Sequence, residues 1–248
     1  MSTPDTFASK PKVRGRFRLP DPPECPEDKM TSFDHLTING NAHHLALHLG
    51  SPETTLVAGD RYLVVRPTRN LAGSRYPDLL VAFGVHPALY KASNGYIIAE
   101  QAGKPPDFVL EIASESTGGV DVGAKRDDYA ALGIPEYWRF DETETGRHHG
   151  ARLAGDRLED GEYSPVPIDE LPDGSLQGYS AVLNLSLRWE RGELVFYDPA
   201  TEQRIATFED ERARADAAEA ERNAERTSRT AAEARIRELE EQLRQQGA

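Results

Sequence analysis

The chain has 248 residues, with 29 Lys and Arg against 42 Asp and Glu, and a formal net charge of −13. A hydrophobic content of 38% excludes wholesale disorder, and the single Cys25 excludes a disulfide scaffold and a cysteine-based metal site. The acidic balance argues against a passive coat on nucleic acid but does not exclude a nuclease. No apolar stretch approaches the ~20 residues of a membrane span and no signal-peptide pattern is present, so we expect a cytoplasmic protein without a membrane segment.

The first 30 residues are expected to form an N-terminal arm. They contain six prolines, which disfavour regular structure. Five cations lie within nine of these residues: Lys10, Lys12, Arg14, Arg16 and Arg18. Two interpretations of them stay open, a solvated flexible arm and a segment that lies along a phosphate backbone.

A domain is expected over residues 31–208. Apolar spacing predicts a short helix at 39–49, and strands are predicted at 56–58, 62–66 and 79–83. A further strand at 107–114, a helix at 122–132 and a strand at 134–140 follow, an order that is typical of a parallel crossover unit.

Short strands are predicted from 150 to 207. The turns between them are predicted at 155–156, 160–161, 172–174 and 191–192. The stretches 180–189 and 193–198 predict a hairpin added to the same sheet.

The last segment, 209–248, is rich in Ala, Glu and Arg and has no Gly or Pro before Gly247, which predicts a long helix. Its small residues recur at alternating steps of four and three, at Ala213, Ala217, Ala220, Ala224, Thr227, Ala231 and Ala234. This spacing favours a coiled coil, but an alanine seam buries little area. A homodimer or partner-binding coiled coil and a solvated single helix therefore both stay open.

The chemically informative residue is Glu111, a carboxylate in the middle of an apolar strand. An unpaired buried carboxylate costs several kcal/mol, so Glu111 needs a cation, a metal or a proton. Asp78 stands at the start of another apolar strand, and two carboxylates on adjacent strands can lie within about 5 Å of each other and hold Mg²⁺. Asp107 is a weaker candidate, because four strand residues separate it from Glu111 by roughly 13 Å.

Lys125 lies near the start of the helix that follows the Glu111 strand. Crossover packing can bring it back over the end of that strand, where it would offer a charge to a scissile phosphate or orient water. Tyr129, one turn later, shares its helix face. The alternative is an exposed Lys125, with Glu111 paired to an arginine.

Three motifs contain these residues: YPDLLVAF at 76–83, PPDFVLEIASEST at 105–117 and DVGAKRDDYAALGIPEYWRFD at 121–141. Together they resemble the Uma-two family of restriction endonucleases, within the PD-(D/E)XK nuclease superfamily, and the resemblance extends over roughly 31–208. It implies a restriction-endonuclease-like α/β (α+β) fold, a mixed sheet flanked by helices, with a C-terminal helical tail.

The resemblance also implies Asp78 and Glu111 as metal ligands for Mg²⁺ or Mn²⁺, Lys125 as the catalytic lysine, and DNA as the substrate. Two departures from the superfamily pattern stand out. The plain E-x-K motif would place its lysine at Ala113, so Lys125 would replace it from the helix. The predicted first helix has no acid, and Glu53 is the next one along the chain.

Other polar residues are interpreted as structural or solvated. His43, His44 and His48 offer an i, i+4 pair that could bind a metal, but no acid or cysteine is nearby. In the run 136–138 we expect packed aromatic rings and an outward carboxylate at Glu136. Two functions stay open: a metal-dependent DNA endonuclease, and a non-catalytic protein with a nuclease-like core that uses its tail for self-association or partners.

Overall fold

The computed structural model describes residues 16–21, 34–113, 123–143 and 151–246. The chain divides into two compact units, residues 1–205 and 206–248, which are described separately. Among the described residues, no helix combines the length and the apolar composition that crossing a membrane requires.

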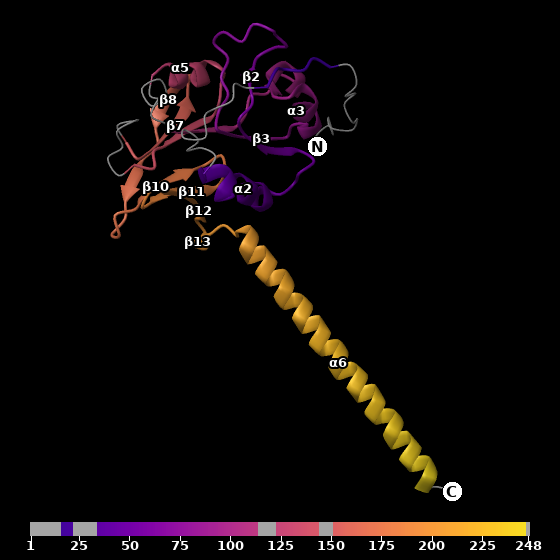
Figure 1. Ribbon diagram of the computed structural model, residues 1–248. Coiled ribbons are helices and arrows are strands. Elements are labelled where there is room, and N and C mark those ends of the chain that lie inside the picture. The colour runs from indigo at the N-terminus through magenta and orange to yellow at the C-terminus, as the bar shows by residue number, and fades with distance from the viewer. Residues whose placement is uncertain (1–15, 22–33, 114–122, 144–150, 247–248) are drawn as a thin grey trace, which may run out of the picture. The chain divides into compact units, whose positions relative to one another are not determined.

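A six-stranded mixed sheet forms the centre of the first unit, in the order β1-β3-β5-β6-β7-β8 (Figure 1). Its strands are β1 (Thr55–Ala58), β3 (Leu79–Phe83), β5 (Phe108–Ile112), β6 (Glu136–Phe140), β7 (Leu153–Glu159) and β8 (Glu162–Pro165). Among the described strands of this sheet, only β5 and β6 pair in parallel, and α5 (Ala124–Ala131) lies between them in the chain. This arrangement confirms the predicted crossover and the mixed α+β fold.

A second sheet has five antiparallel strands in the order β13-β12-β11-β10-β9. They are β9 (Ile168–Glu170), β10 (Leu176–Ser180), β11 (Leu185–Glu190), β12 (Glu193–Asp198) and β13 (Gln203–Arg204). The predicted hairpin exists as β11 and β12, but it belongs to this second sheet rather than to the main one.

The predicted turn at 155–156 is wrong, because both residues lie inside β7. Gly155 has a packing role there. A Cβ at this position would lie 2.9 Å from Cε2 of Trp138, so the strand can pass the indole ring only without a side chain.

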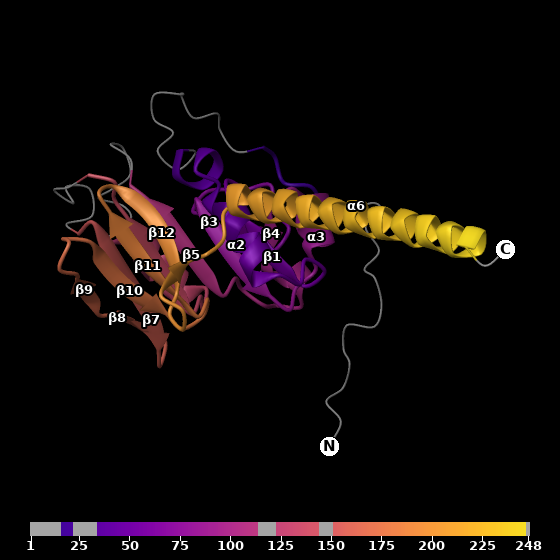
Figure 2. The ribbon, with the colours of Figure 1, turned by 90° about the horizontal axis from the view of Figure 1, so that it is seen from below.

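The two faces of the main sheet bury different partners, as expected from the alternation of side chains along a strand. Leu79, Phe108 and Leu110 point to the side that holds α2 (Asn41–Leu49) and the second sheet. Val109, Tyr137 and the other members of a second cluster point to the side that holds α5 and α3 (Pro87–Ser93) (Figure 1). We call these sides the α2 face and the α5 face. Figure 2 shows the strands β9 to β12 side by side.

Several short elements were not predicted. A π-helical turn, Asp34–Ile38, precedes α2. The chain between β3 and β5 contains α3, β4 (Tyr96–Ile97) and a 3-10 turn, Ile98–Gln101, and β4 pairs in parallel with β2 (Leu63–Val64).

Part of the predicted N-terminal arm packs on the first unit. Leu19 is only 1% exposed, and its N–H donates to the carbonyl of Ser93 over 2.9 Å. The amide of Asn94 donates to the carbonyls of Leu19 and Pro20. A flexible arm is therefore the wrong description for 16–21, because an apolar side chain there finds a buried site. Residues 1–15 and 22–30 of that arm lie outside the described residues.

The second unit is one helix, α6 (Phe208–Gln246), 39 residues long. It confirms the predicted helical tail. Its alanine seam, from Ala213 to Ala234, is exposed along its described length. A coiled-coil partner for this seam remains a prediction.

Candidate active site

Asp78 and Glu111 face each other across β3 and β5. These strands are antiparallel, with Leu79 opposite Leu110. One step further in the same register, Asp78 lies opposite Glu111, and both side chains belong to the α5 face. The Ile112 N–H donates to Asp78 Oδ2 over 2.7 Å, which fixes the Asp78 carboxyl against the end of β5.

Glu111 is 2% exposed, and its described partners come from α5. Lys125 Nζ donates to Glu111 Oε2 over 2.8 Å, and the Tyr129 hydroxyl donates to Oε1 over 2.5 Å. The two residues are one helical turn apart, so one face of α5 supplies both contacts. The crossover returns Lys125 to the carboxylate as the sequence predicted.

The alternative of an exposed lysine is wrong. The Lys125 side chain is only 17% exposed, and its ammonium forms an ion pair with Glu111. Among the described residues, this lysine rather than an arginine is the ion-pair partner of Glu111.

Burial and like charge oppose ionisation of Asp78. Its pKa lies well above the usual carboxyl value, first because the group is desolvated and next because Glu111 places a negative charge nearby. The Ile112 N–H and the Lys125 ammonium act in the opposite direction but do not cancel these effects. Burial and Glu111 also raise the pKa of Tyr129, so its hydroxyl stays protonated and donates to the carboxylate. At Asp78, desolvation and the second acid therefore outweigh the Lys125 ammonium.

The donor set fits a hard divalent cation. Carboxylate oxygens are the ligands that Mg²⁺ prefers, and a cation between Asp78 and Glu111 would relieve the repulsion that raises the Asp78 pKa. Within the described ranges, no group of three or more His, Cys, Asp or Glu side chains is placed to hold a metal ion. The chain would thus offer two carboxylates, and water would complete the coordination, as is usual for Mg²⁺.

The weaker candidates lie elsewhere. Asp107 accepts a hydrogen bond from the Phe83 N–H over 2.8 Å and forms an ion pair with Lys104, at the far end of β5 from Glu111. Glu53 is exposed in the turn before β1. The ring of His43 stacks edge-on against His44. Among the described side chains, His43, His44 and His48 belong to no group of three or more potential metal ligands.

Sequence reasoning missed the support behind Asp78. A Cβ at Gly59 would lie 1.9 Å from the Asp78 carbonyl oxygen, so the backbones touch and only glycine fits. The next residue, Asp60, donates its N–H to the Pro77 carbonyl over 3.1 Å, and its charge contributes to the raised Asp78 pKa. A Gly-Asp pair between two strands reads as an ordinary turn, so only the tertiary structure reveals this role.

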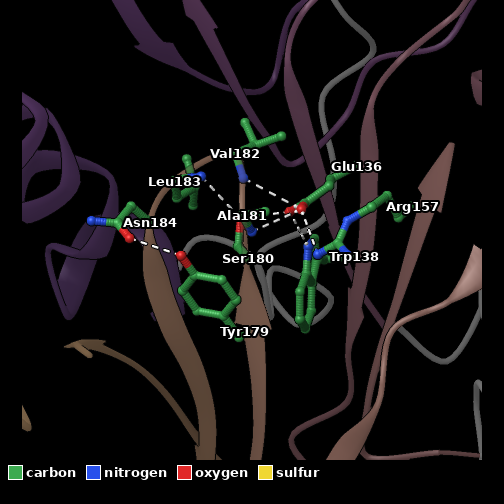
Figure 3. A network of polar contacts seen from close by, with 9 residues as sticks. All are labelled: Glu136, Trp138, Arg157, Tyr179, Ser180, Ala181, Val182, Leu183 and Asn184. Atoms are coloured by element: carbon green, nitrogen blue, oxygen red, sulfur yellow. Dashed lines mark hydrogen bonds and ion pairs between the residues drawn. The ribbon is translucent and has the colours of Figure 1, made fainter. Parts of the chain in front are cut away.

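Glu136 is not the outward carboxylate that the sequence predicted. It is 0% exposed and points to the α2 face, where it accepts five hydrogen bonds (Figure 3). Oε2 accepts from Trp138 Nε1 over 3.0 Å and from the Ser180 hydroxyl over 2.5 Å. Oε1 accepts from the N–H groups of Ala181 and Val182 and from the guanidinium of Arg157. This carboxylate is a structural link between β6 and the turn after β10.

A protein-family model matches most of the first unit. The family model Uma2, described as "Putative restriction endonuclease", matches residues 29–190. The matched range includes the whole main sheet together with Asp78, Glu111 and Lys125. No curated protein matches the chain. Because the family model covers more than half of its residues, the chain belongs to the Uma2 family, whose general context is the PD-(D/E)XK nuclease superfamily.

Proposed function

We propose that this protein is a metal-dependent endonuclease that hydrolyses phosphodiester bonds in DNA, with Mg²⁺ or Mn²⁺ as the cofactor. Asp78 and Glu111 would be the metal ligands and Lys125 the catalytic lysine. The observation that carries the proposal is the meeting of these three side chains at one end of β5, where burial and then the second acid raise the Asp78 pKa. Membership of a restriction endonuclease family supports the nuclease assignment.

Each residue of the candidate site has its own role in the proposed reaction. A bound divalent cation would supply Lewis acidity and a water molecule of lowered pKa. Lys125 holds a positive charge 2.8 Å from Glu111, where it can orient the attacking water or stabilise charge that develops on the phosphate. Tyr129 restrains the second carboxylate oxygen, and Gly59 and the Ile112 N–H hold Asp78 in place.

Cleavage of supercoiled plasmid DNA tests the proposal. With Mg²⁺ or Mn²⁺ the wild-type chain should cleave, and Glu111→Gln and Lys125→Gln should each lower the rate by at least about 100-fold. Glu193→Gln and Lys91→Gln make the same chemical changes at exposed positions and should leave the rate unchanged. If the wild type cleaves no duplex, single-stranded, branched or RNA substrate with either ion, the proposal is wrong.

The exposed seam of α6 and the absence of an acid from α2 favour a second function, a non-catalytic assembly protein. It predicts a dimer or larger species, and no metal-dependent cleavage. The full-length double variant Ala217→Glu, Ala224→Glu should then be monomeric by light scattering. The double variant Ala215→Glu, Ala232→Glu, with the same charges outside the seam, should keep the wild-type mass. A wild-type monomer would exclude this function for α6.

A further inference from the structure

The stretch of the first unit that leads from β1 to β3 is rich in arginine. The stretch 60–75, which leads from β1 through β2 to β3, contains four arginines and one acid. The second sheet, over 168–204, has the reverse balance, with seven acids and three arginines. Within the first unit, the 60–75 stretch is therefore more basic than the second sheet.

An apolar cluster brings the N-terminal segment 16–21 to this region. Leu19, Val64 and Ile97 are buried together, and Phe17, Tyr62 and Leu71 pack around them. The guanidinium carbon of Arg69 lies 5.8 Å from the centre of the Phe17 ring. Arg16 and Arg18 thus lie beside the 60–75 stretch. Arg66 and Arg69 are exposed, and among the described residues neither forms an ion pair.

A cavity lies between two of these arginines, Arg66 and Arg75, and α5, the helix that carries Lys125. It measures about 410 Å³ and lies between the 63–75 stretch and α5. Arg66, Thr68, Asn70 and Arg75 line one wall, and Asp128 and Leu132 of α5 line the other. Arg75 forms an ion pair with Asp128, which follows Lys125 by three residues on the same helix. The cavity therefore ends within one helical turn of the lysine.

We propose that this arginine surface, centred on the exposed Arg66 and Arg69, binds the phosphate backbone of duplex DNA and guides it to Lys125 and Glu111. Arg16, Arg18 and Arg75 border the surface and form ion pairs with Glu100, Asp21 and Asp128. The inference rests on the proposed endonuclease function and adds where the substrate lies. Arginine suits this role, because its planar guanidinium binds phosphate oxygens in pairs and phosphate contacts fix the position of a duplex. The overall negative charge restricts such contacts to the regions where arginine predominates.

Binding measured apart from cleavage tests this surface. Fluorescence anisotropy of a fluorescein-labelled 30-base-pair duplex, in EDTA over a series of salt concentrations, gives the slope of log K against log salt. The variant Arg66→Gln, Arg69→Gln removes two phosphate contacts, so it should weaken binding at least about tenfold and reduce the slope by about 1.8. Arg66→Lys, Arg69→Lys keeps the charge and should recover most of the slope.

The matched control is Arg191→Asn, Arg204→Gln, which removes two exposed arginines from the acidic region and should bind as the wild type does. Asparagine suits position 191, where φ is 53°. Equal losses in the control and in the Arg66, Arg69 variant would assign the effect to net charge and overturn the inference. Unchanged binding by the Arg66, Arg69 variant, no binding by the wild type, or preference for an RNA duplex would also overturn it.

Plasmid cleavage by the same preparations separates the two proposals. Wild-type cleavage together with unchanged binding by the Arg66, Arg69 variant rejects the surface and keeps the endonuclease. DNA binding that depends on these arginines, without any metal-dependent cleavage, keeps the surface and rejects the endonuclease.

Discussion

Two buried glutamates on neighbouring strands, Glu111 and Glu136, have opposite environments. Glu136 accepts five hydrogen bonds from several parts of the chain, and no second acid is among these partners. Lys125 and Tyr129 of α5 contact Glu111, and Asp78 lies beside it on the same face. A buried carboxylate is thus structural where it accepts hydrogen bonds from several parts of the fold. It is a candidate for chemistry where a second buried acid lies beside it.

The largest expected effect is the loss of stability when Glu136, whose carboxylate accepts five hydrogen bonds, is replaced. Glu136→Ala removes the acceptor for five donors and leaves buried polar groups unpaired, so we expect a loss of about 3–5 kcal/mol in the free energy of unfolding. Urea denaturation followed by circular dichroism measures it. Glu193→Ala, an exposed control, should change stability by less than about 0.5 kcal/mol. Equal stability of Glu136→Ala and Glu193→Ala would contradict the structural role of Glu136.

Gly59→Ala should have the next largest effect, because its Cβ would overlap the Asp78 carbonyl and force the backbone to move. We expect a loss of about 1–3 kcal/mol together with weaker metal-dependent cleavage. Gly123→Ala adds the same methyl group where no heavy atom lies within 4 Å, so it should be milder. Retention of full stability and cleavage by Gly59→Ala would show that Asp78 needs no support from this contact.

Tyr129→Phe removes one donor from Glu111 without creating a large cavity. The expected cost is about 1–2 kcal/mol, with a slower cleavage rate at saturating metal because the carboxylate is less restrained. Tyr179→Phe removes an exposed hydroxyl and serves as the control. A wild-type rate for Tyr129→Phe would mean that Lys125 positions Glu111 by itself.

The smallest expected effect is a gain in stability when Asp78 is replaced by asparagine. A raised pKa in the folded state means that Asp78 contributes fully to stability below its unfolded-state pKa of about 3.8 and loses that contribution as the pH rises through the folded value. Asp78→Asn avoids this loss, so in EDTA at pH 7 it should be about 1 kcal/mol more stable than the wild type, with little difference at pH 3.

Magnesium should reverse that order by stabilising the wild type and not Asp78→Asn. Urea denaturation at the two pH values, with and without Mg²⁺, measures both effects, and the exposed Asp169→Asn is the control. A wild type that is more stable than Asp78→Asn in EDTA would contradict the crowding of charge at this site.

Much of the central fold could be predicted from sequence because its signals are local. The apolar run at 79–83 is a strand with those bounds, and the strand-helix-strand order identified the parallel pair. The separate second sheet could not be predicted, because a strand pattern does not specify its partner strand. The turn predicted at Gly155 is wrong for a related reason, because this glycine makes room for an indole ring 17 residues earlier in the chain.

The candidate site could also be predicted only where its sequence signals are local. The placement of Asp78 opposite Glu111 follows from two neighbouring apolar strands, and the contact with Lys125 follows from the crossover. Glu136 was misread because its partners at 180–182 lie more than 40 residues away in the chain. Nothing local distinguishes the glutamate of FVLEI from that of EYWRF, since each stands in a buried strand.

Because Lys125 and Tyr129 both project from the eight-residue helix α5, the two contacts to Glu111 are mechanically coupled. The position and orientation of this one helix therefore set the contacts to both Glu111 carboxylate oxygens.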